Sequence, residues 1–303
     1  MIIQERGSVL KLLAWQWKLC LMLALGALIP IVLVKFLDVD ATDITLPTLP
    51  LTVVGAALGI FVSFRTNSAY DRWWEGRKLW GRLINVSRHL STQIMCYAGA
   101  KARPVPEQVV RRHIAYVHTL RCLLRKQDPF TDENVVAYLT AEERRTMTGE
   151  TNLTHALLHR QMATVVQLSH DGHLDAMQVA SLDESIRVLL DVQGGCERIK
   201  KTPLPRGYGF IAGWLIKAYG FLFPLAVVGQ LGWLTIPANM LVGLGFGLIS
   251  EAGRVLEDPF TLYWNGLPLS DMSRTIERNL LQRLDEVPEL PPAQVPQPEG
   301  VLM

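Results

Sequence analysis

Apolar residues in this chain gather in four long runs, at residues 19–37, 46–64, 208–228 and 231–249, while the middle third is highly polar. A helix needs roughly 20 apolar residues to cross a bilayer core of about 30 Å. Each of the four runs approaches or meets that length. The pattern therefore predicts four transmembrane helices.

The basic residues next to these runs predict how the chain is oriented in the membrane. Lys and Arg precede the first run, follow the second and precede the third, at Arg6, Lys11 and Lys18, at Arg65, Arg72, Arg77 and Lys78, and at Arg198, Lys200, Lys201 and Arg206. The other two connections contain neither residue type. Because positively charged flanks stay on the cytosolic side, we expect both termini and the middle region in the cytosol.

The polar middle predicts helices as well, because its apolar residues recur at spacings of three and four, as in Ile114, Val117, Leu120 and Leu124. Pro104, Pro106 and Pro129 are interpreted as breaks between helices. The predicted fold is an all-α integral membrane protein, with four transmembrane helices that continue into a large cytosolic helical region. Its expected parts are residues 1–64 with the first two spans, the cytosolic region 65–207, spans three and four at 208–250, a cytosolic segment 251–286 and a flexible, proline-rich tail 287–303.

Composition narrows the function further. The net charge of +2 across 303 residues is too small to indicate a nucleic-acid partner. The four cysteines form no CxxC pair, and His155 and His159, although four apart, have no evident third ligand, so neither a metal nor any other cofactor is expected. No catalytic arrangement or phosphate-binding loop can be assembled, so an enzyme is not expected. A signal peptide is the alternative for the first run, but that run is long and no A-x-A-like cleavage site follows it.

The second run carries the most information. Residues 51–64 contain no charge, and Gly55, Gly59 and Ser63 lie four apart, a spacing that lets transmembrane helices pack closely. Ala56, Ile60 and Phe64 form a neighbouring stripe at the same spacing. Such a stripe could line an apolar neck or could simply pack against another helix, and the spacing alone leaves both open.

Three motifs identify a family. The segment LGIFVSFRTNSAY at residues 58–70, followed by Arg72-Trp73-Trp74, is the first; GCERI at 195–199 with Pro203 and Pro205 is the second; LEDPF at 256–260 with Leu267-Pro268-Leu269 is the third. Together, and in this order, they resemble the bacterial branch of the bestrophin channel family. The resemblance covers nearly the whole chain.

The resemblance implies a homopentamer whose helices assemble around one central pore, which the helix at residues 46–64 lines. Ala56, Ile60 and Phe64 match the three neck positions. Ala56 is small, which suggests a wider outer ring. A second constriction in the cytosol is implied near Met177 and Ala180. Animal bestrophins have a calcium clasp of acidic residues where this chain has residues 261–265 (TLYWN), so too few oxygen ligands are present for calcium activation by that route.

The resemblance to bacterial bestrophins also favours monovalent cations, such as sodium and potassium, as the permeating ions. Asp38, Asp40 and Asp43 could concentrate cations at the outer entrance, or could merely reflect the exclusion of Lys and Arg from that side. An anion (chloride) channel of the same architecture is the alternative. The expected location is a bacterial inner membrane, with identical subunits and the lipid bilayer as partners.

Two further functions are less favoured. A secondary transporter normally carries an ionisable group near the bilayer midplane. The spans offer only Lys35, at a span end, and Lys217, which can extend toward the interface. A membrane-anchored scaffold would apply if the likeness were one of fold alone.

Overall fold

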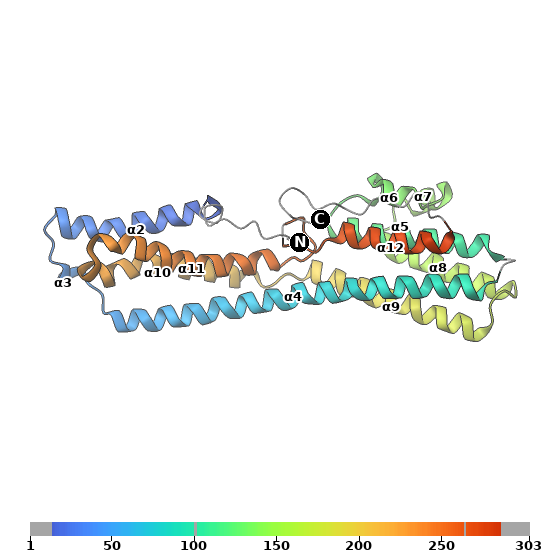
Figure 1. Cartoon of the computed structure of the whole chain (residues 1–303), viewed down its shortest axis with the longest axis horizontal. Helices are drawn as coiled ribbons and strands as arrows, with labels where there is room; N and C mark the ends of the chain where they lie inside the picture. The colour runs from blue at the N-terminus through green and yellow to red at the C-terminus, as the bar shows by residue number, and fades with distance from the viewer. Residues whose placement is uncertain (1–13, 100–101, 264, 286–303) are drawn as a thin grey trace. The chain divides into compact units, whose positions relative to one another are not determined.

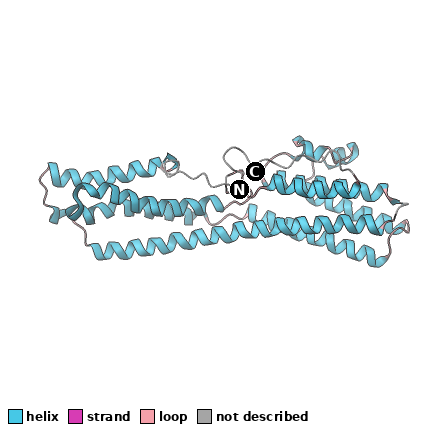
Figure 2. Ribbon diagram, in the orientation of Figure 1, coloured by secondary structure: helices cyan, strands magenta, loops and turns pink. Residues whose placement is uncertain are grey.

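The computed structural model describes residues 14–99, 102–263 and 265–285, and within them the regular structure is entirely helical (Figure 2). The prediction of an all-α fold is confirmed. The chain divides into two compact units. Among the described residues, we call 14–73 and 203–257 the apolar unit, and 74–99, 102–202, 258–263 and 265–285 the polar unit. The predicted tail and the extreme N-terminus lie outside the described residues.

The apolar unit contains the predicted spans. Its helices are α2 (Trp17–Phe36), the short α3 (Ala41–Ile44), the first part of α4 (Thr48–Tyr97), α10 (Arg206–Leu231) and α11 (Thr235–Leu256). Three stretches are long and apolar enough to cross a membrane, namely Trp17–Phe36, Thr48–Tyr97 and Gly207–Leu256. The third holds both α10 and α11, divided by the 3-10 turn η3 (Gly232–Leu234), where Gly232 has a φ of 51°. The count of four spans stays a prediction.

Close packing at glycines holds α2, α10 and α11 together. A Cβ at Gly243 would lie 2.5 Å from Leu23 Cδ1, so only glycine admits this leucine, and Gly220 and Gly247 meet Leu23 and Leu19 in the same way. The buried Asn239 adds a polar link, since its Nδ2 donates to Leu23 O at 2.8 Å and to Gly220 O at 3.0 Å. Small residues are the usual means by which membrane helices approach one another.

Helix α4 runs from Thr48 to Tyr97 without interruption, which confirms the predicted continuity beyond Phe64 (Figure 1). Along one face of α4, buried residues recur at three or four positions, with one gap of seven between Ala69 and Gly76, close to the 3.5-residue period of a coiled-coil seam. They are Leu51, Gly55, Leu58, Val62, Arg65, Ala69, Gly76, Trp80, Leu83, Ser87, Leu90 and Ile94, and Val86, Ser91 and Gln93 are buried in addition. One face of α4 is therefore buried along its whole length, in both units.

The polar unit is built around α5 (Pro104–Leu124), which is buried on most sides and contacts α8 (Leu153–His170), α9 (Ala176–Lys201) and α12 (Leu269–Leu281). Short helices connect them: η2 (Pro129–Thr131), α6 (Glu133–Val136), α7 (Ala141–Met147) and η4 (Gln282–Leu284). Pro104 and Pro129 begin helices, as predicted. Pro106 lies inside the first turn of α5, where proline is tolerated, so its interpretation as a break was wrong.

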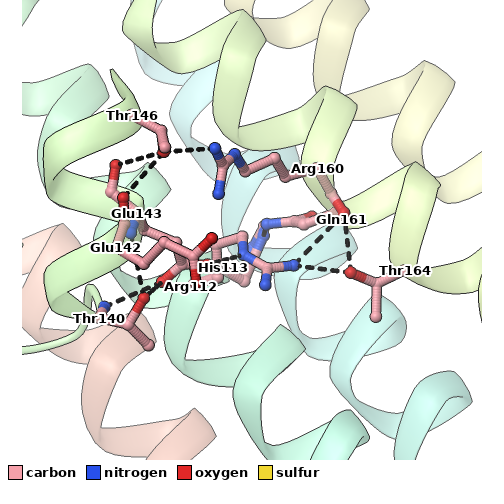
Figure 3. A network of polar contacts seen from close by, with 9 residues as sticks. All are labelled: Arg112, His113, Thr140, Glu142, Glu143, Thr146, Arg160, Gln161 and Thr164. Carbon is pink, nitrogen blue, oxygen red and sulfur yellow. Dashed lines mark hydrogen bonds and ion pairs between the residues drawn. The ribbon is translucent and has the colours of Figure 1, made fainter. Parts of the chain in front are cut away.

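A buried ion pair joins α7 to α5 within the polar unit. Glu143 is 3% exposed and accepts a 2.5 Å hydrogen bond from Arg112 Nε of α5 (Figure 3). Arg112 also donates through Nη1 to Thr164 Oγ1 at 3.0 Å. Burial by itself would raise the pKa of Glu143, but hydrogen bonds from Thr140 and Arg112 outweigh it and hold that pKa below its usual range.

Candidate pore-lining site

Ala56, Ile60 and Phe64 lie on the exposed face of α4, opposite its buried seam. Ile60 is 59% exposed and Phe64 is 69% exposed. Residues four apart are neighbours on a helix surface, so the three form one apolar line along α4. No described part of the chain covers this line.

The opposite, buried face of the same part of α4 packs against α10 and α11. Leu58 and Val62 join a core with Ala212, Ile216 and Tyr219 of α10. A Cβ at Gly55 would lie 2.7 Å from Tyr219 Oη, and one at Gly59 would lie 3.5 Å from a Phe246 ring carbon. The glycines of α4 thus accommodate aromatic rings of α10 and α11, whereas Ser63 is exposed. Packing and the exposed apolar line belong to different faces, a separation that spacing alone did not reveal.

A buried arginine fixes α4 directly beside Phe64. Arg65 is 8% exposed, and its Nη1 donates to the backbone oxygen and to Oγ of Ser250, both at 3.2 Å. Its Nη2 lies 3.5 Å from Glu257 Oε2. Arg65 lies on the buried face of α4, whereas its neighbour Phe64 lies on the exposed face. The sequence pattern indicated only a basic flank at Arg65, so its burial was missed.

Two further hydrogen bonds extend this anchor along α4. Thr66 Oγ1 donates to Ile249 O at 3.0 Å, beside Gly253, where an added Cβ would lie 2.9 Å from the same hydroxyl oxygen. Arg72 Nε donates to Glu257 O at 2.8 Å. The end of α11 is therefore attached to α4 over two turns, which sets the rotation of α4 about its axis.

Met177 and Ala180 lie on the exposed side of α9, in the polar unit, and Met177 is 81% exposed. The start of α9 is fixed by a capping box, in which Asp175 Oδ1 accepts from Gln178 N at 2.8 Å and Gln178 Oε1 accepts from Asp175 N at 3.0 Å. Leu182, further along α9, is fully buried. Met177 and Ala180 thus lie on the exposed side of α9, away from its packed side.

Asp38, Asp40 and Asp43 are all exposed, in and next to α3. Asp40 caps that helix, since its Oδ1 accepts from Thr42 N at 2.9 Å, and this backbone hydrogen bond lowers its pKa. Asp43 lies in the first turn, where a negative charge is favoured by the helix dipole. Two of the acids therefore also stabilise α3.

Other candidate chemistry is absent from the part of the chain that the structure describes. His155 and His159 are exposed on α8, and no group of three or more His, Cys, Asp or Glu side chains in that part is placed to hold a metal ion. The site consists of an apolar helix face and its anchor.

Comparison with known proteins gives this face a context. The profile of a family described as "Bacterial/Fungal Bestrophin protein" matches residues 1–282. The chain belongs to the bacterial and fungal bestrophin family. It is accordingly a membrane ion channel and not an enzyme, as predicted, and the carrier and scaffold alternatives fall away.

Curated relatives of this bestrophin cover most of its length. The "Voltage-dependent anion channel-forming protein RSc3414" of Ralstonia nicotianae is 33% identical over 282 residues, 91% of this chain and 89% of that protein. The protein of the same description from Mesorhizobium japonicum, mll4386, is 32% identical over 83% of this chain and 79% of its own. A solved bacterial bestrophin homolog from Klebsiella pneumoniae is 29% identical, with a TM-score of 0.83, and covers 89% of this chain and 98% of that one.

Proposed function

We propose that this chain is one subunit of a homopentameric bestrophin channel, in which α4 of each copy lines a central pore and Ala56, Ile60 and Phe64 form an apolar neck. The observation that carries this proposal is the exposed apolar line on α4, beside a buried arginine that fixes its direction. The three positions are those that the family resemblance implies.

An apolar ring controls conduction by wetting and dewetting, because water and ions leave a narrow hydrophobic passage. Ile60 and Phe64 supply two large side chains to this neck, while Ala56 leaves its outer ring wide. Met177 and Ala180 form a second constriction in the polar unit. Both positions are exposed in the single chain, as a residue facing a pore has to be.

For the permeating ion we infer monovalent cations, sodium and potassium among them, from the resemblance to bacterial bestrophins. Asp38, Asp40 and Asp43 are exposed together on one short connection, and five copies would place a ring of negative charge at the outer entrance. A specific observation favours the second candidate, an anion channel, because the relatives described above are named as anion channel-forming proteins. The apolar neck itself selects neither sign.

We expect the protein in a bacterial inner membrane, with both chain termini in the cytosol. The support is the distribution of Lys and Arg along the sequence.

The test is single-channel recording of the purified protein in a planar bilayer, with native mass measurement of the oligomer. Phe64→Ala should raise the conductance, because it removes the largest neck side chain. Phe210→Ala is the matched control, since Phe210 is 68% exposed on α10, outside the proposed neck. Equal effects of the two substitutions, or the absence of any current, would contradict the neck, and a mass other than five subunits would contradict the pentamer. The reversal potential under asymmetric potassium chloride gives the sign of the ion.

A further inference from the structure

A pocket of about 440 Å³ opens in the apolar unit, separate from the proposed neck. Its walls come from the start of α2, the first half of α10 and the end of α11. Gln16, Lys18, Lys217, Ser250 and Glu251 supply its polar atoms, and Leu19, Met22 and Ile216 its apolar part. A concave site with a few polar groups on an apolar wall is the usual form of a ligand site.

The charge of this pocket is positive. Lys18 and Lys217 are both exposed, and no described carboxylate forms a salt bridge with either. Glu251 is already engaged, because Arg254 Nε donates to its Oε2 at 2.7 Å. Lys18 Nζ also lies 5.8 Å from the centre of the Trp17 ring, a contact that leaves its positive charge in place. Both ammonium groups can therefore attract an anion.

The level of the pocket along the membrane normal is marked by tryptophans. Trp17 and Trp214, each next to a pocket residue in sequence, are 55% and 62% exposed. Exposed tryptophans gather where the hydrocarbon core meets the lipid headgroups. Beyond Lys18, the outer side of α2 presents Leu21, Leu25 and Ile29, which are 50%, 53% and 57% exposed, as a surface facing acyl chains would be.

We propose that this pocket binds the phosphate-containing headgroup of an anionic phospholipid, held by Lys18 and Lys217. The headgroup phosphate receives the two ammonium groups, and the first carbons of the acyl chains lie against Leu19 and Met22. Lysine pockets between transmembrane helices on the cytosolic side are a known means of recognising anionic lipids. The pocket also lies at the basic end of the first span, on the side predicted to be cytosolic.

Two alternative roles of the lysines predict different binding behaviour. Each lysine could extend independently toward bulk water, as lysines near span ends do. The pocket could also take a soluble phosphate without any lipid. A substitution at Gly213 distinguishes binding inside the pocket from two lysines that act independently. A Cβ added at Gly213 would meet nothing within 4 Å, so a larger side chain can fill the apolar part of the pocket without a clash.

The test uses the full-length channel, delipidated in detergent. Its thermal unfolding midpoint is measured as a function of the concentration of each of three probes: short-chain phosphatidylglycerol, phosphatidylcholine with the same acyl chains, and inorganic phosphate. Each lysine contributes about fivefold to the affinity for an anionic lipid. The double substitution Lys18→Gln and Lys217→Gln should therefore weaken phosphatidylglycerol binding about 25-fold. Phosphatidylcholine should bind the wild type about as weakly as phosphatidylglycerol binds this variant.

Two controls make the result specific. Lys35→Gln removes an exposed lysine from the other end of α2 and should leave phosphatidylglycerol binding unchanged. Gly213→Leu keeps both lysines and should weaken binding by filling the pocket. The proposal is overturned if Lys35→Gln weakens binding as much as the double substitution, if Gly213→Leu has no effect, or if inorganic phosphate binds as tightly as the lipid.

Discussion

Inside the apolar unit, helices meet where glycines admit a leucine or an aromatic ring, whereas inside the polar unit they meet around buried ion pairs. Gly243 and Leu23 represent the first kind of contact, and Arg112 and Glu143 the second. In a bilayer the hydrophobic effect does not drive helices together, so their association depends on close packing. In water apolar burial supplies the association, and buried polar networks can then fix which residues meet.

Burial of titratable groups follows the same division. In the polar unit, His118 Nε2 lies 3.0 Å from Glu277 Oε2, and Tyr138 Oη donates to the other oxygen of Glu277 at 2.6 Å. Burial acts to raise the pKa of Glu277, and these two hydrogen bonds more than reverse it. Among the described residues of the apolar unit, the buried charged group is Arg65, which lies beside the proposed neck. The buried charge of the apolar unit thus lies next to Phe64, in the part of α4 whose orientation the proposed neck depends on.

The largest expected effect comes from breaking a buried pair in the polar unit. Glu143→Ala would leave Arg112 buried without its carboxylate, and their side chains are only 4% and 6% exposed. Loss of one partner of such a pair costs about 3–5 kcal/mol of unfolding free energy. Thermal or chemical unfolding of the purified protein measures this. Glu142→Ala, at the exposed neighbouring position, should change stability by less than about 0.5 kcal/mol, and similar losses for both would contradict the role of the pair.

Much of this fold follows from local sequence signals. The apolar runs, the uninterrupted α4 and the helical middle region were all predicted, because hydropathy and periodicity are properties of neighbouring residues. The anchor of Arg65 was not, because it joins residues 185 positions apart. Arg65 follows an apolar run, as an interfacial arginine would, and only the position of α11 shows that it is buried.

The same limit applies to the candidate site. The apolar stripe and the glycine stripe of α4 are equally regular in sequence, but a regular spacing does not say which face of a helix is covered. On α4 the ring of Tyr219 packs at Gly55, which makes the glycine face the covered one. For Glu143 it is the hydrogen bond from Arg112, a residue distant in sequence, that shows the side chain to be buried. The neck, the Met177 constriction and the outer acids remain predictions, because they concern several copies of the chain.

A second effect should appear as a pH dependence in the polar unit. His113 Nε2 lies 2.8 Å from Ser87 Oγ, and burial lowers the pKa of His113 from 6.5 to about 4. Its folded pKa lies below its unfolded pKa, so its contribution to stability is complete above pH 6.5 and is lost as the pH falls toward 4. The loss approaches about 3 kcal/mol across that window.

The measurement compares the unfolding free energies of the wild type and of His113→Gln at neutral pH and near pH 4.5. The stability difference between them should shrink at the acid value, because the variant has no imidazole to protonate on unfolding. His159→Gln removes an exposed histidine and should show a constant difference. A constant difference for His113→Gln as well would show that its burial is not coupled to protonation.

The smallest expected effect concerns the close packing of α2 and α11 in the apolar unit. Gly243→Ala places a Cβ 2.5 Å from Leu23 Cδ1, so α2 and α11 have to separate or Leu23 has to leave its position. Overpacking of this kind costs about 1–3 kcal/mol. Gly245→Ala is the matched control on the same helix, where an added Cβ meets nothing within 4 Å, and it should be neutral or slightly stabilising. The thermal midpoint of the detergent-solubilised channel separates the two variants. If both substitutions are neutral, close approach at glycine does not hold these helices together, and the contrast between the two units fails.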